Sequence, residues 1–367
     1  MIVYISMIIL AVSFSAMANI KENKTKLIKN GKLNLNILCW YISEIVLIIV
    51  SGFRYDVGMD YMATYVPFFN GILIDSTFNS NIEFGFFLLN KLVQIFTKDY
   101  VGIFVISSVI FFHYMYKGIR ENSEDPTLSV YLLITSTYFF YFLNAMRQML
   151  AISMFFYAIK FIKERKFKKY LFYILLAATF HTSILIVLPL YFLYGLKNNV
   201  KIMFFITIIA IMLKKIIVKA VLELLTLIKY GGYVGSVFDN NKVGVVMILI
   251  NLVILILYII YFYKDIKIKH INFKENEDIN FYLILHLLSL IFLMYDGYIP
   301  LIRRVFMITN ITLILFIPSI LKKEKNIKYR KGITSFIVIC YFTYFIITIG
   351  INNSNSVLPY QSIINRR

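Results

Sequence analysis

Charged residues are scarce in this chain of 367 residues: they make up 16% of it, against roughly 25% in a typical soluble domain. Apolar residues account for 60%, and they form runs too long for the core helices of a soluble domain. The two cysteines, Cys39 and Cys340, both lie in such runs, which argues against a disulfide framework or a thiolate metal site. These features predict an all-α polytopic membrane protein.

Motifs that hold cofactors are missing as well. The four histidines are scattered, and no HxxxH or DxD-like cluster, P-loop or GxGxxG is present. The glycine-rich stretch GGYVGS (231–236) lacks a following lysine motif and is interpreted as a flexible loop. We therefore expect neither a metal nor a cofactor.

Acidic residues are few, with 19 Asp and Glu against 38 Lys and Arg, so the formal net charge is +19. The basic residues gather in short loops between apolar runs, which is typical of cytoplasmic loops and indicates topology rather than nucleic-acid binding. The predicted cytoplasmic loops are 21–32, 163–169, 264–278 and 322–332.

The apolar runs predict about ten full transmembrane helices in a single integral membrane domain, 1–367, with outer loops near 53–83 and 214–242. No basic region precedes the first run, so we expect it to be a retained helix and not a signal peptide. The expected spans are 2–18, 35–52, 100–117, 127–146, 148–162, 202–213, 243–263, 279–298, 304–321 and 333–351.

Two apolar segments do not fit this alternation. The cytoplasmic loops require an even number of crossings between 32 and 117, and two spans already supply them. Segment 84–97, which Glu83 precedes on the outer side, is therefore predicted to be re-entrant or interfacial.

The same parity applies to 170–195, which must return to its own side. Two legs of about 12 residues reach only about 18 Å each, short of a hydrocarbon core about 30 Å thick. We predict a hairpin that turns near FHTS, with His181 and Ser183 at membrane depth. The following stretch, 214–230, is predicted to be an amphipathic interfacial helix.

Charged residues beside the spans cluster on the predicted outer side, where they are candidates for function. Arginines come from three separate elements, and guanidinium groups bind phosphate in a bidentate manner without losing their charge. An anionic, phosphate-bearing ligand at the outer leaflet is the simplest common target. The residues are Arg54, Asp56, Asp60, Arg147, Asp296, Arg303 and Arg304.

Each of these residues also has a structural interpretation. Arg147 alone could extend to the lipid headgroups. Asp56 and Asp60 share a helix face and could pair with Arg54. His181 could be a neutral histidine that is hydrogen-bonded within the bundle, although its place at the predicted break favours function.

The order of several motifs resembles the EpsG-like branch of the Wzy-type polysaccharide polymerases, over about residues 40–365. The first two motifs are FRYDVGMDYMATYVPFF (53–69) and IEFGFFLLNKLV (82–93). The most specific is LNAMRQMLAISMFFYAIKFIKERKFKKYLFYILLAATFHTSILIVLPLYF (143–192). The last is SVLPYQS (356–362).

This resemblance implies a metal-independent glycosyltransferase with a C-type glycosyltransferase-like fold in the bacterial cytoplasmic (inner) membrane. Its active site would face the outside, or periplasm. The enzyme would join oligosaccharide repeat units carried on undecaprenyl pyrophosphate, moving the growing chain to the non-reducing end of the next unit. O-antigen of lipopolysaccharide, capsule and exopolysaccharide are all possible products. A chain-length regulator protein is a possible partner.

The resemblance also implies roles for particular residues. Arg147 and Gln148 would bind the pyrophosphate, and Arg303 or Arg304 would be a second clamp. Arg54 would support the donor or acceptor phosphate. Fixed arginines suit this chemistry because negative charge builds on the departing diphosphate.

The acceptor hydroxyl must lose a proton, and His181 is a candidate for the base or orienting group. Asp56 and Asp60 are the rival candidates.

Three other functions remain open at this stage. A ligase from lipid carrier to acceptor would share the donor, but its loss would leave polymer on the carrier. A flippase or transporter of lipid-linked sugars would show paired broken helices, and only one strong break is evident. A membrane scaffold would not need arginines from three elements at one level.

Overall fold

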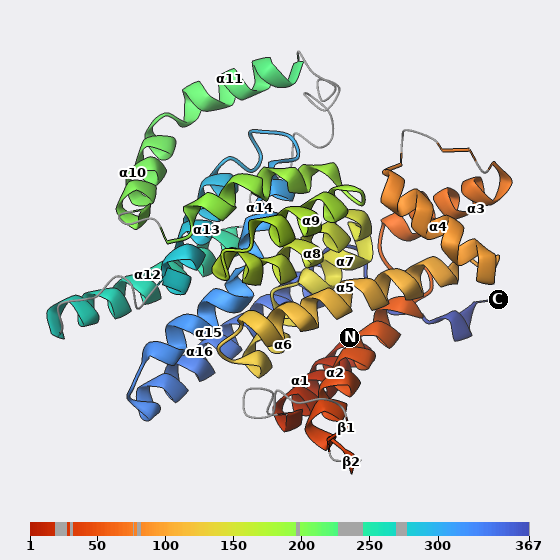
Figure 1. The fold of residues 1–367 in the computed structure, drawn as a ribbon, viewed down its shortest axis with the longest axis horizontal. Coiled ribbons are helices and arrows are strands. Elements are labelled where there is room, and N and C mark those ends of the chain that lie inside the picture. Colours follow the sequence, from red (N-terminus) through yellow and green to blue (C-terminus); the bar gives the residue numbers. More distant parts are fainter. Residues whose placement is uncertain are drawn as a thin grey trace. The chain divides into compact units, whose positions relative to one another are not determined.

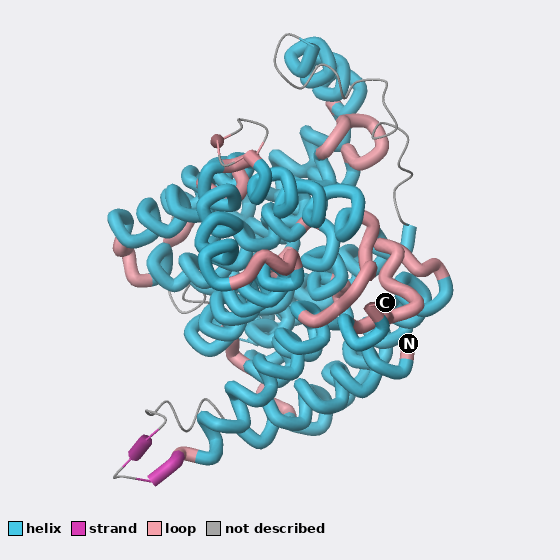
Figure 2. Tube along the Cα trace, turned by 90° about the vertical axis from the view of Figure 1, so that its right-hand side faces the viewer, coloured by secondary structure: helices cyan, strands magenta, loops and turns pink. Residues whose placement is uncertain are grey.

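The computed structural model describes residues 1–18, 28–29, 32–75, 77–78, 82–195, 199–226, 245–268 and 277–366. Figures 1 and 2 show a protein made of helices, with one small antiparallel hairpin in the described part, β1 (Ile28–Lys29) paired with β2 (Lys32–Leu33). The all-α prediction is confirmed.

The described helices follow one another along the whole chain. The α-helices are α1 (Ile2–Ala18), α2 (Leu35–Gly52), α3 (Val66–Ile74), α4 (Phe84–Phe96), α5 (Val101–Asn122), α6 (Pro126–Thr135), α7 (Tyr138–Asn144), α8 (Met146–Lys163), α9 (Phe167–Ala178), α10 (Asn199–Met212), α11 (Lys214–Thr226), α12 (Val245–Ile268), α13 (Glu277–Met294), α14 (Ile302–Asn310), α15 (Leu313–Lys323) and α16 (Ile327–Phe345). The π- and 3₁₀-helices are η1 (Tyr61–Tyr65), η2 (Thr182–Leu193), η6 (Ile346–Ile351) and η7 (Ile363–Asn365).

The chain divides into two compact units. Unit 1 comprises Met1–Leu188 and Ile327–Arg367, and unit 2 comprises Pro189–Asn326. Because the relative placement of the units is not determined, each is described by itself.

Five helical stretches in the described chain are long and apolar enough to span a bilayer. A sixth results if α6 and α7, which meet at an angle of 50°, count as one broken span. The five are Leu35–Gly52, Val101–Asn122, Glu277–Met294, Ile302–Lys323 and Ile327–Ile351. The protein is therefore a multi-pass membrane protein by the length and composition of its helices.

The prediction of about ten full spans is not confirmed. Helix α1 and the apolar parts of α10 and α12 are among the shorter apolar helices, and α8 carries Arg147, Lys160 and Lys163 within its 18 residues. A run of apolar residues shows how much of the sequence avoids water. Breaks in the helix decide how much of that run forms one continuous helix.

One end of unit 1 gathers segments that are far apart in the sequence. The Tyr4 hydroxyl, at the start of α1, donates to the carbonyl of Val357, 2.9 Å away. The amide of Tyr55, just after α2, donates to the carbonyl of Gln361 at 2.9 Å. The C-terminal tail thus closes over the beginning of α1 and the end of α2. We name this the tail end of unit 1.

Basic residues lie at the opposite end, where α5 and α8 both finish. Lys160 pairs with Glu121 at 3.6 Å, and the Lys117 ammonium lies 4.7 Å from the centre of the Tyr157 ring. The basic ends of α5 and α8 thus lie together, next to the predicted cytoplasmic loop 163–169. That the tail end faces outward stays a prediction from the positive-inside rule.

Segment 84–97 begins and ends at the tail end, and its re-entrant or interfacial placement in a bilayer stays a prediction. Glu83, which precedes α4, pairs with Arg147 at the start of α8. Asp99, which follows α4, pairs with Arg366 of the tail at 2.7 Å. Helix α4 packs against α3. The Gln94 side chain of α4 donates to the carbonyl of Phe69 in α3 at 2.8 Å.

The hairpin predicted within 170–195 is also present. Helix α9 ends at Ala178 and η2 begins at Thr182, and the two legs lie side by side because the Tyr170 hydroxyl donates to the carbonyl of Val187 at 2.6 Å. His181 lies at the turn between them. Its depth in a bilayer stays a prediction.

Helices α5 and α8 pack closely because α5 carries a glycine at their contact. A Cβ atom on Gly118 would lie 2.5 Å from the Phe156 ring. Only a hydrogen fits there, so the backbones approach without a cavity or a clash. This contact holds the helix that carries Arg147.

Replacing Gly118 by alanine should overpack this contact. We expect it to lower the free energy of unfolding by about 1–3 kcal/mol, measured as a lower melting temperature of the detergent-solubilised protein. Gly71→Ala is the matched control, since a Cβ there meets nothing within 4 Å. Equal melting temperatures for the two variants would contradict the close contact.

Candidate functional site

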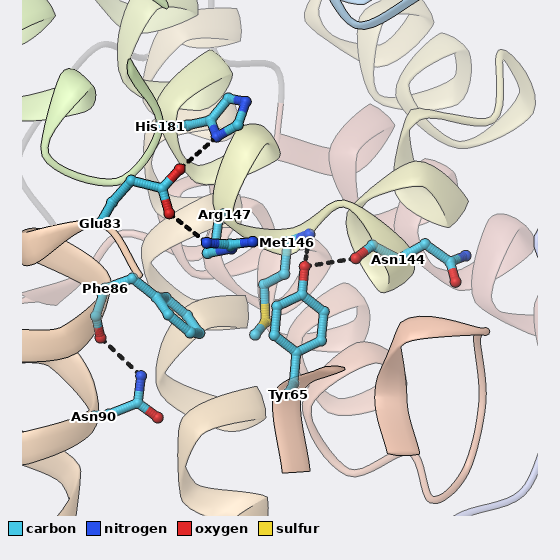
Figure 3. Close-up of polar contacts among 8 residues, drawn as sticks. All are labelled: Tyr65, Glu83, Phe86, Asn90, Asn144, Met146, Arg147 and His181. Carbon is cyan, nitrogen blue, oxygen red and sulfur yellow. Dashed lines mark hydrogen bonds and ion pairs between the residues drawn. The ribbon is translucent and has the colours of Figure 1, made fainter. Parts of the chain in front are cut away.

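A partly buried glutamate links an arginine and a histidine at the tail end of unit 1. The two carboxylate oxygens of Glu83 have different partners: one accepts from Nη1 of Arg147, and the other lies 2.8 Å from Nδ1 of His181 (Figure 3). The exposed fractions of the three side chains are 18% for Glu83, 23% for Arg147 and 15% for His181. We name these residues the Glu83 cluster.

Each member of the cluster comes from the end of a different helix. Glu83 precedes α4, Arg147 lies in the first turn of α8, and His181 lies at the turn between α9 and η2. The cluster therefore depends on three helix ends meeting, and no local sequence pattern alone could produce it.

Gly85 holds the first of these ends against the third. Its amide donates to the carbonyl of Thr179 at 2.8 Å. A Cβ at this position would lie 2.3 Å from the Thr179 hydroxyl oxygen and 2.9 Å from its carbonyl carbon, so glycine is required for the close approach. This contact brings Glu83 within reach of His181.

A tyrosine fixes the second end, the break between α7 and α8. The Tyr65 hydroxyl donates to the carbonyl of Asn144 at 2.6 Å and accepts from the amide of Met146 at 2.7 Å (Figure 3). Both backbone groups are left without helical partners by the break, and one phenol satisfies them. Burial raises the pKa of Tyr65, so the hydroxyl keeps the proton that it donates.

The Asn144 side chain ties this break to two further segments of the tail end. Its Nδ2 donates to the carbonyl of Asn355 in the tail at 3.0 Å, and its Oδ1 accepts from the amide of Asp60 at 3.4 Å. Arg147 therefore starts from a backbone held at several points.

The electrostatics of the cluster favour a charged carboxylate. Burial acts to raise the pKa of Glu83, but the hydrogen bond with His181 and the charge of Arg147 outweigh it, so the pKa lies below its usual range. Glu83 is accordingly ionised at neutral pH. The Arg147 guanidinium also lies over the Phe68 ring, 5.3 Å from its centre.

Arg54 lies at the same end of unit 1 as Arg147, as predicted, but it is not placed to bind a phosphate. It is fully buried, and its guanidinium donates to the carbonyls of Ser51, Val57 and Leu143 at 2.5, 3.2 and 3.1 Å. The ring of Phe104 covers it at 4.7 Å. The structure makes Arg54 a tie between the end of α2 and the end of α7, and this burial disfavours the expected ligand role, which stays a prediction.

The rival acidic residues lie on the segment between α2 and η1. Asp56 is exposed and has a left-handed backbone, with φ 49°. Asp60 lies near the α7–α8 break, and its carboxylate accepts from the Thr64 hydroxyl at 3.5 Å. Gln148 is only 4% exposed, and this burial disfavours direct contact with a substrate.

Arg303 and Arg304 belong to unit 2. Arg303 is ion-paired with the buried carboxylate of Asp296, with Nε 2.9 Å from Oδ2, and Arg304 is exposed. The expectation that one of them is a second pyrophosphate clamp stays a prediction. In the described part of the chain, His, Cys, Asp and Glu side chains form no group of three that could hold a metal ion.

Comparison with known proteins gives one match. A model of the EpsG family matches residues 37–362, a range that contains every candidate site residue discussed above. The chain belongs to the EpsG family. No protein of curated function and no solved structure matches it significantly.

Membership of the EpsG family indicates a membrane polysaccharide repeat-unit polymerase, which is consistent with glycosyltransferase-type chemistry. The expected resemblance is thereby confirmed. Within this EpsG protein, the structure adds a cluster that offers a cation for an anionic group and an imidazole for a proton.

Two residues of the candidate site, Glu83 and Tyr65, could not be given a role from the sequence. Glu83 could be placed on the outer side, but its partners could not be found because they lie on other helix ends. Tyr65 stands among four aromatic residues in YMATYVPFF (61–69) and has no local mark of its function. The one sequence feature that pointed to Glu83 was its position as a lone acidic residue before the apolar segment 84–97.

Arg54→Met should destabilise the EpsG protein, because three buried carbonyls would lose their donors at about 1–3 kcal/mol for each unsatisfied group. We expect a clearly lower melting temperature and poor yield of folded protein. Arg330→Met, at a partly exposed arginine of α16, is the control and should behave as wild type. An unchanged melting temperature for Arg54→Met would instead restore Arg54 as a candidate ligand.

Proposed function

We propose that this protein polymerises oligosaccharide repeat units carried on undecaprenyl pyrophosphate at the outer face of the bacterial cytoplasmic membrane. The growing chain would leave its own lipid pyrophosphate and be joined to the non-reducing end of the incoming unit. In this proposal Arg147 binds the pyrophosphate and His181 accepts the proton of the attacking hydroxyl.

The observation that carries the proposal is the joining of Arg147 and His181 through Glu83. A polymerase of this kind needs a fixed positive charge beside a proton acceptor, because the leaving diphosphate and the attacking hydroxyl meet at one carbon atom. The Glu83 cluster supplies both from rigid helix ends, and all three side chains are partly exposed.

Arg147 has capacity for a ligand. One N–H group on Nη1 serves Glu83, and in the described part of the chain its side chain makes no other hydrogen bond. The remaining N–H groups can donate to phosphate oxygens as an edge of a planar fork. His181 is favoured over Asp56 and Asp60 because hydrogen bonds through Glu83 join it to Arg147.

The proposed step balances without any further reactant. The acceptor hydroxyl oxygen forms a bond to the anomeric carbon of the growing chain, and the bond from that carbon to the pyrophosphate oxygen breaks. The bonding electron pair leaves with undecaprenyl pyrophosphate, whose added negative charge Arg147 stabilises. The hydroxyl proton passes to Nε2 of His181 and then to water.

Arg147→Ala should abolish long chains and leave single units on the lipid carrier, with a loss of extension of at least about 10²-fold. The assay uses lipid-linked units extracted from a strain that lacks the gene, added to purified protein in proteoliposomes, with products resolved by length. Arg147→Lys keeps the charge without the planar fork, so its extension activity should lie between those of the wild type and Arg147→Ala. Arg330→Ala is the matched control.

The products also separate the competing functions. Normal chain lengths with Arg147→Ala would refute the assignment of the site. Cells without the protein that accumulate complete polymer on the carrier would indicate a ligase. Units that stay on the inner face in such cells would indicate a flippase.

A further inference from the structure

We infer that Glu83 is a positioning residue that fixes the tautomer of His181 and so makes Nε2 the basic nitrogen. This inference rests on the proposed function and extends it, because it says how an ordinary histidine on a hairpin turn becomes a base of defined orientation. Glu83 itself is not proposed to touch the substrate.

The hydrogen bond between Glu83 and His181 determines which imidazole nitrogen carries the proton. An ionised carboxylate can only accept hydrogen bonds, and the pKa of Glu83 is held below its usual range. The nitrogen 2.8 Å from its Oε1, Nδ1 of His181, must therefore carry the proton and donate it. In neutral imidazole the other nitrogen, Nε2, is then the unprotonated acceptor.

The second oxygen of Glu83 accepts from Arg147, so the two side chains that bind this carboxylate are cationic or potentially cationic. This arrangement prevents the carboxylate from rotating away from either partner. Glu83 therefore couples the site for the leaving group to the site for the proton through one rigid group on the helix end that Gly85 holds.

Two charged groups of the described chain lie near His181, at the starts of two different helices. Glu83 faces it from the start of α4, and Arg147 lies beyond Glu83 at the start of α8. Tyr65 and Asp60 interact electrostatically with one another, and Tyr65 also interacts with Arg147. Of these groups in the described part of the chain, Glu83 is the one that is hydrogen-bonded to the imidazole.

During the step, Nδ1 keeps its proton throughout, and Nε2 gains the proton of the acceptor hydroxyl. The imidazole becomes an imidazolium, and the negative charge of Glu83 stabilises it. After the lipid pyrophosphate leaves, Nε2 returns its proton to water. Glu83 gains and loses no proton in the cycle.

The variant Glu83→Gln separates the two tasks of the carboxylate. A glutamine has one carbonyl oxygen, so it can accept from His181 or from Arg147, but its amide group cannot accept from the second partner. It also lacks the negative charge. Glu83→Asp keeps the negative charge on a shorter side chain. Glu121→Gln removes an ion-paired glutamate near the C-terminal end of α5 and serves as the control.

We expect Glu83→Gln to lower the polymerisation rate in proteoliposomes at least about tenfold. The imidazole of His181 should also lose its single tautomer, because no carboxylate then holds the proton on Nδ1. Glu83→Asp should keep the Nδ1–H tautomer with a lower rate. Glu121→Gln should match wild type in both.

A second measurement is independent of activity. Protein labelled with ¹⁵N-histidine and reconstituted in lipid nanodiscs should show His181 as the Nδ1–H tautomer at alkaline pH, with its signals identified by their loss in His181→Gln. Glu83→Gln should show a mixture of tautomers. A wild-type signal from the Nε2–H tautomer would overturn the inference even if a variant failed to fold.

The failure of this inference can be told apart from the failure of the proposed function. If Glu83→Gln polymerises at the wild-type rate with an unchanged His181 tautomer while Arg147→Ala is inactive, Glu83 has no positioning role and the polymerase assignment stands. If Arg147→Ala also polymerises normally, the proposed site itself is wrong. A rate loss in Glu83→Gln with a lower melting temperature and an unchanged tautomer would show a merely structural role.

Discussion

A partly buried carboxylate that must be paired is the constraint on which the site depends. Removing Glu83 from water is costly unless positive or donor groups satisfy both of its oxygens. Arg147 and His181 do so, and each is brought there by the end of a different helix. The same pairing that lowers the cost of burying Glu83 therefore locks the two functional side chains into one arrangement.

The breaks between helices are the second requirement for the Glu83 cluster. Without them Arg147 and His181 would lie within continuous helices and not at helix ends that meet. The chain stops α7 at Asn144 and restarts at Met146, and it stops α9 at Ala178 before the turn that holds His181. Each break leaves backbone groups without helical partners, which is expensive in an apolar environment. The Tyr65 hydroxyl and the contact of Gly85 with Thr179 satisfy them.

The two arginines of unit 1 show how the same side chain serves opposite purposes. Arg54 directs its donors to backbone carbonyls and has no exposed surface, so it holds the tail end together. Arg147 uses one donor for Glu83 and keeps part of its surface open. Both stand beside apolar runs in the sequence, and nothing in their neighbours distinguishes them. Only their accessibility and their partners separate a structural arginine from a functional one.

Composition and hydrophobic runs by themselves determined the membrane class, the helical architecture and the turn near His181. These features follow from solvation, because apolar residues avoid water and lysines avoid lipid wherever the chain goes. The number of straight spans, the burial of Arg54 and the pairing of Glu83 with Arg147 and His181 were decided by tertiary structure. They depend on where helices break and which ends meet, and that is set by close packing between residues that are far apart along the chain.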